Sequence, residues 1–187
     1  AEDAVAVLDH LGIEKAQLVG MSLGGKVANI IYGMHPERVS SIIMIASGAW
    51  DDYYFQLPQP HPQMIEYWNS ADTVDWRDEN AVIEHQIRAW EVMNGSRRKF
   101  DREGIRRMIL LDNARVKSLQ SMFNHSLLGG GDKYLGIQRN INVPVTIIHG
   151  TDDPVLPYEH ALYTHETTPN SKLITLEGAG HELHHDD

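Results

Sequence analysis

Ser22 is the residue of this sequence whose surroundings best suit nucleophilic chemistry. It stands in GMSLGG, residues 20–25, which fits the pattern G-x-S-x-G and lies between a short apolar run and a segment with helical spacing. A strand-to-helix turn of this kind is so tight that the serine takes strained backbone angles, and side chains two positions to either side are expected to collide. Such a turn raises the Ser22 hydroxyl above a sheet and points the backbone N–H of Leu23 at a developing oxyanion. An ordinary glycine-serine loop is the alternative.

A serine hydroxyl is a weak nucleophile at its ordinary pKa, so it needs a base and an acid that orients this base. Two later apolar runs end in suitable residues. The segment HGTDDPVLP, residues 149–157, contains Asp152 and Asp153, and the segment GAGH ends in His181. Because the carboxyl ends of parallel strands meet at one edge of a sheet, these side chains are expected to converge on Ser22.

The histidine-rich end of the sequence offers a competing metal site. HELHH, residues 181–185, fits the pattern H-E-x-x-H, in which two histidines one helical turn apart bind zinc and the glutamate serves as general base. His181 and His185 need a helix for this geometry, but the glycines directly before them favour a loop. No third ligand follows in the sequence. We therefore expect serine chemistry with no metal and no cofactor.

The elements that must position these residues alternate along the chain. Apolar runs predict buried strands at residues 16–20, 41–47, 143–150 and 172–178, and helical spacing occurs at residues 24–35 and near 158–167. This alternation is typical of a parallel α/β sheet.

Residues 48–140 interrupt this alternation. Helices are expected at residues 78–93, 102–112 and 115–128, after a loop rich in proline and aromatic residues. The organisation predicted is a core of residues 1–47 and 141–187 with an inserted helical cap at 48–140. Some large side chains of the insertion are expected to line an apolar pocket. They are Trp50, Tyr53, Tyr54, Phe55, Trp68, Trp76 and Trp90.

Composition restricts the partners. The 187 residues suit a single domain, and 16 Lys and Arg against 26 Asp and Glu give a net charge of −10. This charge argues against binding to nucleic acid or to an anionic membrane. Cysteine is absent, which excludes disulfides and a thiol nucleophile. No run has the length of a membrane span or the form of a signal peptide, so a cytoplasmic location is the default expectation.

Four segments resemble the α/β-hydrolase superfamily: LVGMSLGG, HPERV, VPVTIIHGTDDPVLP and GAGH. The resemblance implies an α/β-hydrolase-type, mainly parallel sheet with an inserted cap, with Ser22 as nucleophile and His181 as base. Members usually take their acid from G-x-x-D after the penultimate strand, which selects Asp153 and leaves Asp152 as a solvated neighbour. Because some members place the acid after an earlier strand, Asp51 and Asp52 are the alternative.

The resemblance extends to function. It implies a serine hydrolase that cleaves a small or medium apolar carboxylic ester through an acyl-enzyme, similar to capped esterases such as the aclacinomycin-methylesterase-like proteins. A cofactor-free haloperoxidase or C–C bond hydrolase would use the same triad, and a non-catalytic ligand receptor could retain it. The sequence departs from the superfamily in lacking strands before residue 16 and the second oxyanion donor that their loops supply. We therefore expect a chain that is incomplete at its N-terminus.

Overall fold

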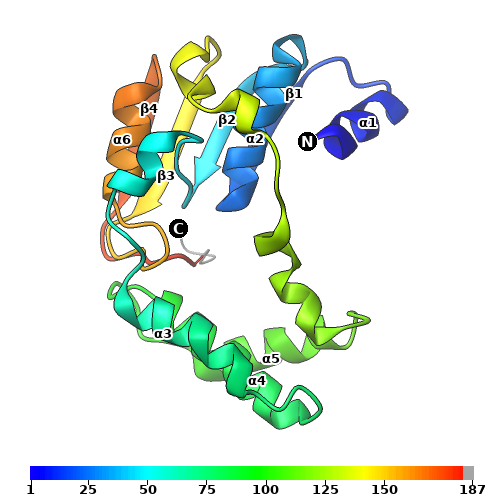
Figure 1. Ribbon diagram of the computed structural model, residues 1–187, viewed down its shortest axis with the longest axis vertical. Coiled ribbons are helices and arrows are strands. Elements are labelled where there is room, and N and C mark those ends of the chain that lie inside the picture. The colour runs from blue at the N-terminus through cyan, green and yellow to red at the C-terminus, as the bar shows by residue number, and fades with distance from the viewer. Residues whose placement is uncertain (183–187) are drawn as a thin grey trace.

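A four-stranded parallel sheet lies in the upper half of the protein as drawn in Figure 1. The computed structural model describes residues 1–182, except for the side chains of residues 122, 123 and 126. The strands are β1 (Ala16–Met21), β2 (Val39–Ile45), β3 (Val145–Gly150) and β4 (Ser171–Leu176), in the spatial order β1-β2-β3-β4. All neighbouring pairs are parallel, which confirms the predicted fold class and the four predicted strands to within two residues at each end.

Apolar side chains of three helices pack with those of the sheet. These helices are α1 (Glu2–His10), α2 (Leu23–Met34) and α6 (Glu159–Thr167). The shared core joins Ile42 of β2 and Ile147 of β3, both fully buried, to Ile31 of α2 and Ala161 of α6. Burial of each isoleucine side chain contributes about 1.5–3 kcal/mol to stability. The core thereby fixes the strand ends from which the candidate site residues project.

The long connection between β2 and β3 contains three further α-helices, which lie beyond the carboxyl ends of the strands (Figure 1). They are α3 (Pro62–Ser70), α4 (Glu79–Met93) and α5 (Arg102–Asn113). Helices α4 and α5 confirm two predictions. Each begins after an aspartate that caps it: Asp78 accepts hydrogen bonds from the N–H groups of Asn80 and Ala81, and Asp101 accepts one from Gly104.

The third helix predicted in this connection is wrong in type and extent. In place of an α-helix at 115–128, the structure has a 3₁₀ helix, η4, at Leu119–Leu127. Its first residues show the physical reason. The Ser118 side chain makes no capping hydrogen bond, and the Ser121 hydroxyl donates to the Ser118 carbonyl at 2.7 Å, a local bond that competes with the α-helical pattern.

Helix α3 was not predicted, because its first residues were assigned to the proline-rich loop. Pro62 is the first residue of the helix, a position that tolerates the missing N–H and that benefits from the fixed φ of proline. His61 precedes it and accepts a hydrogen bond from the N–H of Gln63 through its ring. Pro62 therefore indicated the start of a helix, although proline is more often associated with a loop or a helix end.

Short 3₁₀ helices complete the described chain: η1 (Pro36–Arg38), η2 (Asp52–Gln56), η3 (Ala71–Thr73), η5 (Asp132–Tyr134) and η6 (Ile137–Asn140). Within residues 1–182, no helix combines the length and the apolar character that crossing a lipid bilayer requires.

Candidate active site

Ser22 lies in the turn between β1 and α2 with a backbone conformation that few side chains adopt. Its φ is +50° and its ψ is −118°. The Ser22 N–H donates a hydrogen bond to the carbonyl of Ile45 on β2 at 2.9 Å, which ties the turn to the neighbouring strand. Gly20 makes the turn possible, because a Cβ at this position would lie 2.2 Å from the backbone of Gly24. The sequence therefore builds a strained turn that presents Ser22, as a nucleophile turn requires.

The second glycine constraint falls one residue later than predicted. A Cβ added at Gly24 would meet no atom within 4 Å, so the expected collision there is wrong. At Gly25, by contrast, a Cβ would lie 2.4 Å from the Oγ of Ser47, which follows β2. The same Oγ donates a hydrogen bond to the Ser22 carbonyl at 2.6 Å. Residue 25 is therefore a glycine because the turn lies so close to the end of β2.

Leu23 is the first residue of α2. Its backbone N–H belongs to the first helical turn, in which the N–H groups have no acceptor within the helix. The positive end of the helix dipole lies at the same place. This position is consistent with the predicted role of Leu23 as an oxyanion donor.

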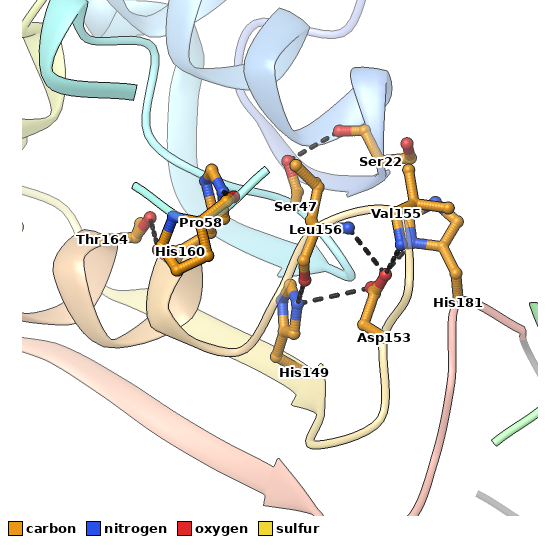
Figure 2. A network of polar contacts seen from close by, with 10 residues as sticks. All are labelled: Ser22, Ser47, Pro58, His149, Asp153, Val155, Leu156, His160, Thr164 and His181. Carbon is orange, nitrogen blue, oxygen red and sulfur yellow. Dashed lines mark hydrogen bonds and ion pairs between the residues drawn. The ribbon is translucent and has the colours of Figure 1, made fainter. Parts of the chain in front are cut away.

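Asp153 follows β3 and points its carboxylate at His181 (Figure 2). Its side chain is fully buried. Oδ1 accepts hydrogen bonds from the N–H groups of Val155 and Leu156, both at 2.8 Å, and Oδ2 lies 2.7 Å from Nδ1 of His181. Because a carboxylate oxygen accepts, Nδ1 carries the hydrogen and Nε2 of His181 has a free lone pair. The pair has the geometry of an acid that orients a base.

The other candidate acids have different partners. Asp51 is buried, and its Oδ2 pairs with the side chains of Gln138 and Arg139, at 2.7 and 2.9 Å. Asp52 begins the 3₁₀ helix η2 and is exposed. Asp152 is also exposed, but it is more than a solvated neighbour: its Oδ2 accepts from the N–H of Ser96 at 3.0 Å.

The Ser96 hydrogen bonds lower the pKa of Asp152. They belong to a set of close contacts that hold the acid loop and the loop carrying His181 against the residues at the end of α4. The His181 N–H donates to the Met93 carbonyl at 2.9 Å. A Cβ at Gly180 would lie 2.0 Å from that carbonyl oxygen, and one at Gly95 would lie 2.1 Å from the carbonyl oxygen of Gly178. Sequence reasoning missed this role of Gly95, because the contact joins residues more than 80 positions apart in the chain.

Ser22 and His181 line one cavity of about 710 Å³. Most of the remaining wall is apolar or aromatic and comes from α3, η3, α4 and η4. The wall includes Met64, Tyr67, Trp68, Ala71, Trp76, Ala89, Met93 and Val155, with Asp72, Gln120 and His125 as polar members. Of the aromatic residues singled out from the sequence, Trp68 and Trp76 are at the cavity. Burial raises the pKa of Tyr67 to about 12, so its hydroxyl stays neutral.

Comparison with known proteins agrees with the fold. The model of the family described as alpha/beta hydrolase fold matches residues 1–187. The chain belongs to the α/β-hydrolase family. The curated relatives of this α/β hydrolase include rhodomycin D methylesterase DauP from Streptomyces sp. strain C5, which is 26% identical over 198 residues; the match covers 98% of this chain and 66% of DauP.

Solved structures share the fold of this chain. An esterase from Exiguobacterium antarcticum superposes with a TM-score of 0.72 at 20% identity, over 98% of this chain and 66% of its own. The 2-hydroxy-6-oxo-6-phenylhexa-2,4-dienoate hydrolase from Rhodococcus sp. strain RHA1 gives a TM-score of 0.71 at 21% identity, over 96% and 62%. The chain therefore spans slightly less than two thirds of the length of these proteins.

The described part of the H-E-x-x-H motif is not helical in this chain. His181 is in a loop with Nδ1 on Asp153, and Glu182 Oε1 accepts from the N–H of Gly95 at 3.2 Å. His185, the second ligand of the zinc hypothesis, lies outside the described residues. Within residues 1–182, no three His, Cys, Asp or Glu side chains are grouped so that they could hold a metal ion.

Sequence reasoning assigned no role to His149, the first residue of the segment HGTDDPVLP. It is the last residue but one of β3, with 1% of its surface exposed. Its Nε2 lies 2.8 Å from the carbonyl oxygen of Leu156 and 3.3 Å from Oδ2 of Asp153 (Figure 2). Burial lowers the pKa of His149. A second imidazole thus contacts the same carboxylate oxygen as His181.

Proposed function

We propose that this α/β hydrolase is a serine hydrolase that cleaves a small or medium apolar carboxylic ester through an acyl-enzyme. The observation that carries the proposal is the cavity lined by both Ser22 and His181, whose Nδ1 lies 2.7 Å from Asp153. A nucleophile, a base and an acid at one apolar cavity support acyl transfer. The curated relative named a methylesterase supports an ester as substrate.

In this mechanism His181 is the base, because its Nδ1–H is committed to Asp153 and its Nε2 is available. Nε2 takes the proton of the Ser22 hydroxyl while Oγ forms a bond to the ester carbonyl carbon. The carbonyl oxygen becomes an oxyanion, to which the N–H of Leu23 donates. Asp153 stabilises the imidazolium without taking its proton.

The tetrahedral intermediate then breaks its carbon–oxygen bond to the leaving group. His181 gives its proton to the departing alkoxide, so an alcohol leaves and the acyl group stays on Ser22. A water molecule next attacks the acyl carbon, with His181 again taking a proton. The carboxylic acid departs and Ser22 recovers its proton.

The cavity supports an apolar substrate. Its methionine, tryptophan and alanine side chains favour a hydrocarbon or aromatic group by removing its apolar surface from water. The net charge of −10 disfavours strongly anionic substrates. We also propose that residues 48–140 form a cap over a core of residues 1–47 and 141–187, because helices of this segment supply most of the cavity wall.

The experiment uses the whole natural protein and p-nitrophenyl esters with acyl chains of increasing length. A burst of nitrophenol before steady turnover indicates an acyl-enzyme. Ser22→Ala and His181→Ala are expected to remove both the burst and the turnover while circular dichroism stays unchanged. Hydrolysis that survives in folded Ser22→Ala would contradict the proposal. A native protein that binds esters without turnover would favour a receptor, and turnover of C–C bonds alone would favour the C–C bond hydrolases.

A further inference from the structure

His149 belongs to a closed ring of polar contacts around the acid, made of two hydrogen bonds and one close nitrogen–oxygen contact. Its Nε2 contacts the Leu156 carbonyl oxygen at 2.8 Å, and the Leu156 N–H donates to Oδ1 of Asp153 at 2.8 Å. Oδ2 of Asp153 closes the ring, 3.3 Å from Nε2 of His149. Figure 2 shows both contacts to this one nitrogen. The ring ties the end of β3 to the turn that presents Asp153.

The Leu156 carbonyl decides which nitrogen of His149 carries a hydrogen. A carbonyl oxygen accepts and cannot donate, so Nε2 is the donor. The hydrogen on Nε2 carries a partial positive charge, and it lies near the Asp153 carboxylate as well as the Leu156 carbonyl oxygen. Burial lowers the pKa of His149, which keeps the imidazole neutral. The acid thus has a fixed neutral donor on one side of Oδ2 and the candidate catalytic base on the other.

We propose that His149 is a positioning residue for the acid–base pair: its Nε2–H, fixed by the Leu156 carbonyl, holds the Asp153 carboxylate so that Oδ2 faces Nδ1 of His181. The inference rests on the proposed serine hydrolase function. The two backbone N–H groups on Oδ1 fix one oxygen of the acid, and His149 fixes the other. It also offsets part of the negative charge that acts on His181.

Other titratable groups near His149 come from the start of α6. The ring of Tyr158 lies 6.3 Å from that of His149, measured between centroids, and His160 follows two residues later. His160 is a matched control, because it is also buried and its Nε2 also contacts a carbonyl oxygen, that of Pro58, at 2.9 Å. This partner belongs to the segment before α3 and not to the turn that presents Asp153.

The test measures the rate at which a fluorophosphonate labels Ser22 in the whole natural protein, as a function of pH. In His149→Phe an aromatic ring still occupies the site, but the N–H donor is lost. We expect the plateau rate to fall about tenfold or more, equivalent to about 1.4 kcal/mol, and its pH midpoint to rise because the acid acts more strongly on His181. His149→Gln restores an N–H donor, so rate and midpoint are expected to return towards the native values. His160→Phe is expected to leave both unchanged.

The outcomes separate this inference from the proposed function. If the native protein is not labelled at Ser22, the serine hydrolase proposal itself fails. If the native protein is labelled but folded His149→Phe keeps the native rate or midpoint, His149 has no positioning role. Equal losses in His149→Phe and His149→Gln would assign the effect to ring packing and would also overturn the inference.

Discussion

The sheet side of the cavity is held by hydrogen bonds and close backbone contacts, whereas the helical side is held by apolar packing. The sheet wall, Ser22, Val155 and His181, projects from turns in which single atoms are fixed. The helix wall comprises Met64, Tyr67, Trp68, Ala71, Trp76, Ala89 and Met93. Three of these, Met64, Tyr67 and Ala89, form a buried cluster against which Val155 of the acid loop packs.

This difference separates two tasks. Proton transfer needs atoms held to a fraction of an ångström, and the sheet wall supplies such positions through the backbone. Selection of an apolar substrate needs a cavity of complementary shape that excludes water, and side chains of several kinds can supply this. Substitutions in the sheet wall are therefore expected to act on rate, and those in the helix wall on substrate preference and stability.

The largest effect is expected from Asp153→Asn. The amide places a donor or a weakened acceptor against Nδ1 of His181. The imidazole then loses the negative charge that orients it and the preference for the tautomer with hydrogen on Nδ1. A loss of about 10⁴ in turnover is expected. Asp152→Asn is the matched control, because its partner is the Ser96 N–H, and a change of less than about threefold is expected. Ester hydrolysis measures both. Similar losses in the two variants would move the acid away from Asp153.

The backbone of the nucleophile turn offers the next test. Gly20→Ala forces a Cβ to within 2.2 Å of the Gly24 backbone, and we expect a destabilisation of about 3 kcal/mol. Gly24→Ala adds the same methyl group where nothing lies within 4 Å, inside α2, and is expected to be neutral or to stabilise by up to about 1 kcal/mol. Urea unfolding measures both. A Gly20→Ala protein of native stability would show that the turn is not constrained as described.

The pH dependence of stability tests the burial of the histidines beside the sheet wall. Burial lowers the pKa of His149 and of His160, so the unfolded chain binds protons that the folded protein does not. The free energy of unfolding is therefore expected to fall as pH drops below about 6.5, with a slope of at most about 1.4 kcal/mol per pH unit for each histidine. Urea unfolding at about pH 7.5 and pH 5.5 measures the change.

His160→Gln is expected to flatten this slope, because it removes one of the histidines whose pKa burial lowers. A slope that is the same in the native protein and in His160→Gln would mean that His160 is protonated equally easily in both states.

The smallest effect is expected in the helix wall. The Tyr67 hydroxyl is buried without a hydrogen-bond partner among the described residues. Tyr67→Phe removes an uncompensated polar group, so the free energy of unfolding is expected to stay constant or to rise by up to about 1 kcal/mol. Thermal unfolding measures it, with acyl-chain preference as a second readout. A clear loss of stability would show that the hydroxyl has a partner and that the helix wall also depends on fixed polar geometry.

The sequence predicted the sheet wall better than the helix wall for a physical reason. The turns of Ser22 and His181 carry their signal locally, as glycines directly after apolar strands. The contact of Gly25 with Ser47 depends on the pairing of two strands and left no local signal. In the helix wall, the identity of the cavity residues depends on how α3 and α4 pack, and α3 itself was missed because its proline stands at the helix start. Pairing of Asp153 with His149 likewise needed the folded turn.

The most direct test of the central claim is to treat the whole natural protein with a fluorophosphonate and to locate the adduct by peptide mass spectrometry. We expect a single adduct on Ser22 that is absent from Ser22→Ala and strongly reduced in folded His181→Ala, because the hydroxyl is activated by that imidazole. Absence of an adduct from the folded native protein, or an adduct on another serine, would contradict the account.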